Sequence, residues 1–230
     1  MKINKLTITG ADNATNQTEL VNLSNEYPFI EWALLFSKHK AGEQRYPSPE
    51  YIASLVQNTI IPLAAHFCGW WAKEVLENKN YDLIRNLPLN FERVQLNYNF
   101  KNSTGYSLLA LYKFAEANPD RGIILQFNKS NKEILTEFLV GGLPENIHFL
   151  YDSSGGNGKE IERIEATLGE QYTGYAGGIN QENVDKICQM ITDDAEQVNT
   201  WIDLESGART DNEFDLVKVR DIIAKVRQFI

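Results

Sequence analysis

Residues 147–159 read IHFLYDSSGGNGK, an apolar run that ends in Asp152 and is followed by a cluster of glycines. The apolar run is typical of a buried strand, and the glycines are typical of a loop that leads into a helix. Backbone N–H groups of Gly155 and Gly156, beside a helix N-terminus, could bind an anion close to the carboxylate of Asp152. The alternative is an ordinary turn, because an acid followed by glycine is also common turn chemistry.

The same alternation of a short β-rich run and a helical run recurs along the whole chain. The expected strands are 5–9, 29–37, 62–69, 92–99, 121–128, 147–152, 172–176 and 200–205. The expected helices are 17–25, 48–60, 71–78, 104–118, 131–140, 158–168, 180–194 and 213–229. Strict alternation predicts parallel strands with right-handed crossovers, and the number of units predicts closure into a single (β/α)₈ TIM barrel over residues 1–230. The competing architecture is a doubly wound open sheet.

The composition limits the classes of partner and cofactor. A hydrophobic fraction of 43% is enough for a substantial core, while a formal net charge of −9 argues against nucleic acid as a partner. Cys68 and Cys188 are far apart and belong to no Cys/His cluster, so neither a metal site nor another cofactor is expected. No apolar run is long enough to span a membrane, and the polar N-terminus indicates a cytoplasmic protein. Monomer and homodimer are not distinguished.

Several short segments resemble one enzyme family. Residues 175–184, YAGGINQENV, resemble the Ala-Gly-Gly-Leu-x-Pro-Glu-Asn-Val segment of phosphoribosylanthranilate isomerases, which are barrels of the tryptophan pathway. Further matches occur in the same chain order and are, by residue range, 8–10 (ITG), 45–50 (RYPSPE), 94–97 (VQLN), 152–159 (DSSGGNGK) and 202–207 (IDLESG). The matches span most of the expected barrel, so the chain is interpreted as a divergent member of this family.

The resemblance implies a reaction and a set of site residues. The family converts an N-linked phosphoribosyl amine into an aminoketose by an Amadori rearrangement, which requires a general acid and a general base. By this resemblance Asp152 is the general acid and Arg45 holds the substrate's anthranilate carboxylate. The implied phosphate site is formed by Gly155, Gly156, Gly177, Gly178, Ser206 and Gly207.

The departures from the family pattern concern the base and the charges near the phosphate. Thr9 stands where the family has its base cysteine, and a hydroxyl is too weakly acidic to supply an oxyanion without an activating partner. Glu205 replaces a serine, and Arg209 replaces a glutamate four residues later. We therefore expect Arg209 to offset Glu205 or to contact the anion of the ligand directly.

Other residues could complete the site. Cys68 lies at the C-terminal end of an expected strand and is a candidate for a displaced thiolate base, although buried cysteines are more often core residues. Gln95, Asn97 and Asn128 are expected, with Gln126, to form a polar ring that binds sugar hydroxyls. The sequence thus predicts a barrel that binds a phosphorylated sugar derivative, with isomerase or related acid–base chemistry; the alternative is a non-catalytic phosphometabolite-binding or regulatory protein.

Overall fold

The eight predicted strands form the wall of a barrel. In this computed structural model, residues 2–58, 61–100, 103–129, 131–139, 142–153, 161, 164, 171–193 and 199–230 are described. The strands are β1 (Lys2–Thr9), β2 (Ile30–Phe36), β3 (Leu63–Cys68), β4 (Phe91–Asn97), β5 (Gly122–Phe127), β6 (Ile147–Asp152), β7 (Thr173–Ala176) and β8 (Asn199–Leu204). They pair in chain order, all in parallel, and β8 closes on β1. The predicted (β/α)₈ barrel is therefore confirmed, and the open sheet is excluded.

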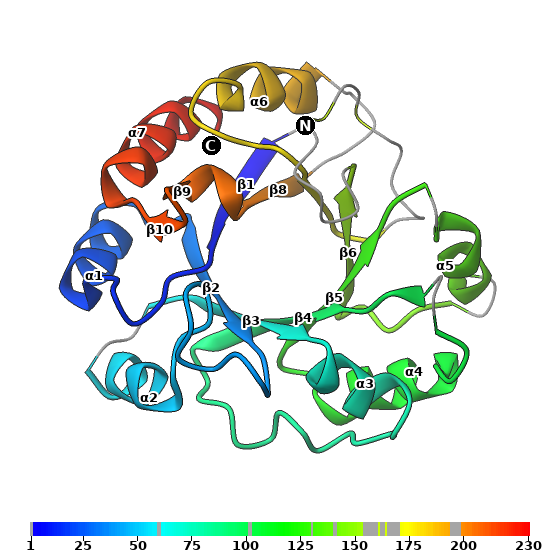
Figure 1. The fold of residues 1–230 in the computed structure, drawn as a ribbon. Coiled ribbons are helices and arrows are strands. Elements are labelled where there is room, and N and C mark those ends of the chain that lie inside the picture. Colours follow the sequence, from blue (N-terminus) through cyan, green and yellow to red (C-terminus); the bar gives the residue numbers. More distant parts are fainter. Residues whose placement is uncertain are drawn as a thin grey trace.

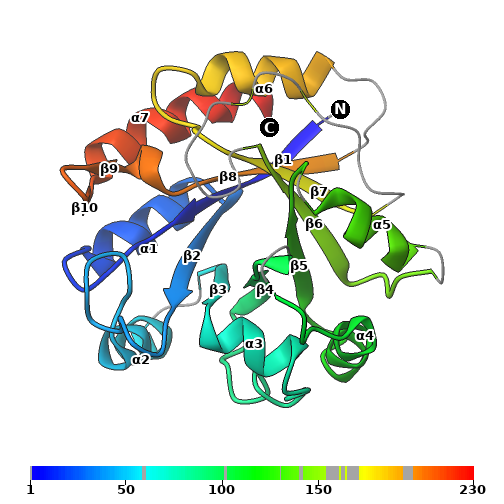
Figure 2. The same cartoon turned by 45° about the vertical axis from the view of Figure 1, so that its right-hand side comes forward.

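Helices cover the outside of this wall, as Figure 1 shows in a view into the barrel. They are α1 (Gln17–Glu26), α2 (Pro49–Asn58), α3 (Trp70–Leu76), α4 (Leu108–Ala117), α5 (Lys132–Leu139), α6 (Val184–Asp193) and α7 (Leu216–Val226). Most of the buried apolar residues form one cluster. Figure 2 shows the tilted strands with the helices on their outer side. The expected helix 158–168 falls almost entirely outside the described residues.

The last two helices begin later than predicted. In the expected helix 180–194 the side-chain oxygen of Asn180 accepts from the N–H of Glu182, as an N-cap residue does, but regular helix α6 begins only at Val184. The last helix was expected from residue 213, yet β9 (Arg209–Thr210) and β10 (Glu213–Phe214) form a small hairpin there. Its two turn residues have positive φ angles, 49° at Asp211 and 67° at Asn212, as a tight hairpin turn requires. Asp215 then caps α7.

Glycine allows one large side chain to fill the barrel interior. A Cβ atom at Gly174 would lie 2.2 Å from the ring of Trp201, so no other residue fits on β7 at this position. Trp201 is completely buried and forms a small cluster with Ile124 and Leu150. This cluster fills part of the barrel interior.

In the part of the chain that the structure describes, no helix has the length and apolar character needed to cross a membrane.

Candidate functional site

A cavity of about 660 Å³ opens at the C-terminal ends of the strands. In a TIM barrel this face carries the functional residues, because the loops that follow all eight strands meet there. The cavity is lined by Thr9, Arg45, His66, Gln95, Asn97, Gln126, Leu150, Asp152, Ala176, Gly177, Gly178, Ile179, Asp203, Leu204, Glu205 and Ser206. Several residues that are distant in the sequence and were predicted to form a site thus line one cavity.

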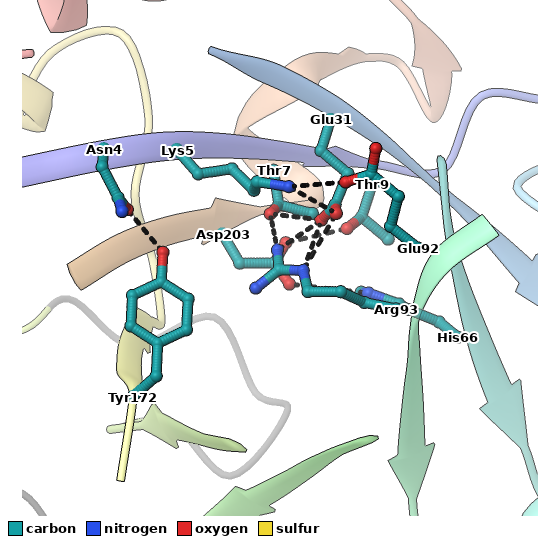
Figure 3. Close-up of polar contacts among 10 residues, drawn as sticks. All are labelled: Asn4, Lys5, Thr7, Thr9, Glu31, His66, Glu92, Arg93, Tyr172 and Asp203. Carbon is teal, nitrogen blue, oxygen red and sulfur yellow. Dashed lines mark hydrogen bonds and ion pairs between the residues drawn. The ribbon is translucent and has the colours of Figure 1, made fainter. Parts of the chain in front are cut away.

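Asp203 is a buried acid in this cavity that sequence reasoning did not assign. It lies on β8, and its Oδ1 accepts a hydrogen bond of 2.8 Å from the hydroxyl of Thr9 (Figure 3). Burial raises the pKa of Asp203 to about 7, while the hydrogen bond from Thr9 acts in the opposite direction. Both the protonated and the ionised forms are therefore populated near neutral pH, as a proton-transfer group needs. A signal was present, since Asp203 stands inside the matched segment 202–207.

His66 lies beside Asp203 but does not form an ion pair with it. Its Nε2 is 3.8 Å from Oδ2 of Asp203. Burial lowers the pKa of His66 to about 3, so the imidazole is neutral at physiological pH. Nε2 of His66 has no hydrogen-bond partner among the described residues. A buried polar atom of this kind is costly to leave unpaired, so it favours a ligand that can hydrogen-bond there.

The neighbouring strands contribute an amide-rich wall. Nε2 of Gln95 donates to Oδ1 of Asn97 at 2.8 Å, and Oε1 of Gln95 has no partner within the described chain. The side-chain amide of Gln126 donates to Asp152. Asp152 and Asp203 both pair in register with Ala176, whose small side chain lies between them on β7. The two acids are thus separated by one strand at the mouth of the barrel.

Only part of the predicted phosphate site lies within the residues that the structure describes. Gly177 and Gly178 line the cavity with positive φ angles of 119° and 61°, which favour glycine, and Ser206 lies in the next loop. Gly207 is buried, and a Cβ atom there would lie 2.0 Å from the carbonyl oxygen of Ile179. This close approach gives Gly207 a packing role that sequence reasoning missed. Gly155 and Gly156 lie outside the described residues.

The charged residues near the rim pair differently from the predicted arrangement. Arg45 donates from Nη1 to Oε1 of Glu205 at 2.7 Å. Arg209 instead pairs with Asp12 at 2.8 Å and donates to the carbonyl oxygens of Gly10 and Asn212. The prediction that Arg209 offsets Glu205 is therefore wrong. Arg209 does not line the cavity. Its contacts with Gly10, Asp12 and Asn212 join the loop after β1 to the hairpin after β8.

Two other predicted site residues do not line the cavity. Cys68 accepts a weak hydrogen bond from Nδ2 of Asn97 at 3.4 Å, and burial raises the pKa of its thiol. A raised pKa disfavours the thiolate that a base would require. Asn128 lies just beyond β5, where its N–H donates to Oδ1 of Asn131. Cys188, the other cysteine, is buried in α6 and belongs to the core.

A second set of buried charges lies deeper in the barrel (Figure 3). Nε of Arg93 donates to both carboxylate oxygens of Glu31, at 2.9 and 3.0 Å, and Lys5 approaches the same carboxylate at 3.2 Å. Thr7 donates to Glu31 and accepts from Arg93. The two cations outweigh the effect of burial and hold the pKa of Glu31 at about 2. These paired charges form a layer below Asp203 in the barrel.

Comparisons with known proteins show the same architecture. No protein-family model and no curated protein sequence matches this chain. The structure of phosphoribosyl anthranilate isomerase from Thermococcus kodakaraensis is similar, with a TM-score of 0.60 and 15% identity over 97% of this chain and 99% of that one. N-(5'-phosphoribosyl)anthranilate isomerase from Pyrococcus furiosus gives a TM-score of 0.61 and 12% identity, over 97% and 98% of the two chains.

A third similar structure has a different title. Triosephosphate isomerase from Bartonella henselae gives a TM-score of 0.56 and 12% identity, covering 98% of this chain and 99% of that one. At these identities the likeness establishes the fold alone. Function has to be argued from the cavity.

Proposed function

We propose that this protein is an acid–base isomerase that acts on a phosphorylated sugar derivative by an aldose–ketose rearrangement of the Amadori type. The observation that carries the proposal is Asp203, a buried carboxyl in the cavity with a pKa of about 7. General acid–base catalysis is most effective when the pKa of the group lies near the working pH. The isomerase titles among the similar structures support the same reaction class.

Thr9 stands where the family has its base cysteine, so the resemblance assigns no base to this chain. In the proposed mechanism Asp203 is the general base. In the proposed reaction Asp152 donates a proton to the ring oxygen and the ring opens. The carboxylate of Asp203 then takes the proton from the adjacent sugar carbon, so one proton enters and one leaves the substrate. Thr9 is not the base itself; its hydroxyl donates to Asp203 and fixes the orientation of the carboxylate.

Backbone amides are the proposed phosphate ligands. The N–H groups of Gly177, Gly178 and Ser206 are at the loops after β7 and β8, where TIM barrels commonly bind phosphate. These N–H groups donate no hydrogen bond to another residue of the described chain. Backbone amides can bind a phosphate without a lysine or arginine.

The experiment combines ligand binding with isotope exchange. Phosphorylated aldoses and N-glycosylamine phosphates are screened by thermal shift, where a ligand at 100 times its Kd adds about 2.7 kcal/mol of stability. Each stabilising compound is then incubated with the protein in D₂O, and deuterium at the carbon next to the anomeric carbon is measured by NMR. We expect exchange with the wild type and a loss of about 10²- to 10⁴-fold in Asp203→Asn, with binding retained.

Two outcomes contradict the proposal. Exchange that is equally fast in wild type and in Asp203→Asn removes Asp203 as the base. Binding without any exchange or turnover in the wild type favours the alternative, a phosphometabolite-binding protein that is not an enzyme. Asp152→Asn, which should abolish turnover but leave Asp203 in place, is the matched variant for the general acid.

A further inference from the structure

The ion pair between Arg45 and Glu205 is built into the rim of the cavity. Arg45 lies in the loop after β2 with a φ angle of 74°, which is unusual for a residue other than glycine. Its N–H donates to Oδ2 of Asp12, its Nε donates to Oδ1 of Asn212, and its Nη1 meets Glu205 at 2.7 Å. Asp12 thus fixes the backbone of Arg45, and Asn212 and Glu205 fix its guanidinium.

This ion pair also separates two hollows. Arg45 and Glu205 line the main cavity and a second cavity of about 630 Å³ whose other lining residues are Lys40, Glu43, Gln44, Tyr46 and Asn212. Lys40 lies over the ring of Tyr46, with its Nζ 5.4 Å from the ring centroid, on the outer side. A ligand in the main cavity therefore meets Arg45 and Glu205 together, as a neutralised pair.

The remaining charges in the main cavity are negative. Arg45 is the only lysine or arginine among the described lining residues, whereas Asp152, Asp203 and Glu205 are all acidic. Arg209 is the next guanidinium in the region, and Asp12 already pairs with it. A ligand carboxylate placed at Arg45 would have to displace Glu205 and would lie beside its negative charge. This like-charge contact disfavours such a ligand, and solvent screens it in part because the side chains of Arg45 and Glu205 are 33% and 38% exposed.

The unpaired polar atoms of the cavity indicate which ligand groups it can bind in place of a carboxylate. Oε1 of Gln95 can only accept a hydrogen bond, and it has no donor within the described chain. Nε2 of His66 is similarly unpartnered and belongs to a neutral ring. Oε1 of Gln95 and the three carboxyl groups match hydroxyl or ammonium groups, and Nε2 of His66 can pair with a hydroxyl in either tautomer.

We propose that Glu205 sets the substrate class of this cavity by occupying Arg45. Ligands with a carboxylate at that position are rejected, and the part of the substrate that lies away from its phosphate is neutral or cationic, with hydroxyl or amino groups. This inference rests on the proposed function for the location of the substrate. It deepens that function by naming a specificity-determining residue.

Two small probes of similar size test the inference directly. Benzoate and benzylamine, which carry opposite charges at pH 7, are titrated into wild type, Glu205→Gln and the double variant Glu205→Gln/Arg45→Gln, with Kd measured by ligand-observed NMR. We expect wild type to prefer benzylamine. In Glu205→Gln the Kd of benzoate should fall at least about tenfold, because the freed guanidinium can bind the carboxylate. The double variant should lose this gain, since the cation is gone.

Each alternative result overturns the inference. Benzoate binding that is equally tight in wild type and Glu205→Gln shows that Glu205 does not exclude carboxylates. A failure of both Glu205→Gln and Glu205→Ser to bind benzoate, in proteins whose thermal unfolding is unchanged, shows that Arg45 is not available even when freed. Glu205→Ser is the second variant, in case the glutamine side chain itself keeps Arg45 occupied.

These results are independent of catalysis. The titrations need no turnover, so they decide the role of Glu205 even if Asp203→Asn leaves isotope exchange unchanged. In the same way, a loss of exchange in Asp203→Asn supports the proposed function even if benzoate binds to all three proteins.

Discussion

Glu31 and Asp203 are both buried carboxyl groups inside the same barrel, and their pKa values move in opposite directions. Thr7 on β1 pairs in register with Glu31 on one side and with Asp203 on the other, so the two acids flank the same strand. Glu31 has Arg93 and Lys5 as partners, and its pKa falls to about 2. Among the described residues Asp203 has the hydroxyl of Thr9 as its hydrogen-bond partner, and burial raises its pKa to about 7.

The difference separates a structural acid from a functional one. Burial penalises the ionised form of both groups, but only Glu31 has cations close enough to reverse the effect. Arg93 agrees with this assignment, since Glu31 raises the pKa of its guanidinium. An acid that stays ionised and paired near neutral pH supports the structure, whereas an acid left without a cation can exchange a proton.

The largest effect is expected from Glu31→Gln. The substitution leaves the charge of Arg93 buried without its partner, and the free energy of unfolding at pH 7 should fall by about 3–5 kcal/mol, measured by urea denaturation. The matched control is Glu92→Gln, because Glu92 contacts the same Lys5 at 3.2 Å but is half exposed. An exposed pair of this kind contributes about 0–1 kcal/mol.

The stability lost in Glu31→Gln should become smaller as the pH falls. The pKa of Glu31 is lowered from 4.5 to about 2 in the folded protein. Its contribution is therefore complete above the unfolded pKa and is lost as the pH falls from about 4.5 toward 2. Equal destabilisation by Glu31→Gln and Glu92→Gln, or a difference that does not shrink in acid, would contradict a structural role for the pair.

Asp203→Asn should have a smaller effect on stability, with the opposite sign. The pKa of Asp203 is raised from 3.8 to about 7, so its favourable contribution is present below pH 3.8 and is lost as the pH rises through 7. Asparagine stays neutral and can still accept from Thr9. We expect Asp203→Asn to raise the free energy of unfolding by roughly 2 to 4 kcal/mol at pH 8 and to leave it nearly unchanged at pH 4. A variant that is less stable at pH 8 would show that the carboxylate is not strained by burial.

The comparison also shows which features can be predicted from sequence. Each strand was predicted because apolar runs and their flanking turn residues are local signals, and β6 was placed at 147–152 without error. Thr9 and Asp152 were assigned to the site by the resemblance of short segments, Gln95 and Asn97 by their polar side chains near the end of an expected strand, and all four line the cavity.

Pairings between distant segments were not predictable in the same way. Glu31 and Arg93 come from β2 and β4, which are not adjacent in the sheet, so only the curvature of the closed barrel brings them together. Glu205 was assigned to Arg209, its near neighbour in sequence, but it pairs with Arg45 from a loop 160 residues away. The hairpin after β8 holds Arg209 at Asp12 and presents Asn212 to Arg45. No local pattern reports such contacts.

The smallest and most specific effect is expected from Thr9→Val, which removes the single hydrogen bond to Asp203 and nearly preserves the size of the side chain. That bond lowers the pKa of Asp203, so its loss should raise the pKa by about one unit, the equivalent of about 1.4 kcal/mol. Because the ionised form acts as the base, the rise of isotope exchange with pH should move to higher pH by the same amount. Thr9→Ser keeps the hydroxyl and should titrate like wild type. The pKa of Asp203 can be followed by ¹³C NMR of its carboxyl carbon without any substrate, and a pKa that is identical in Thr9→Val and Thr9→Ser would show that the hydroxyl does not tune the base.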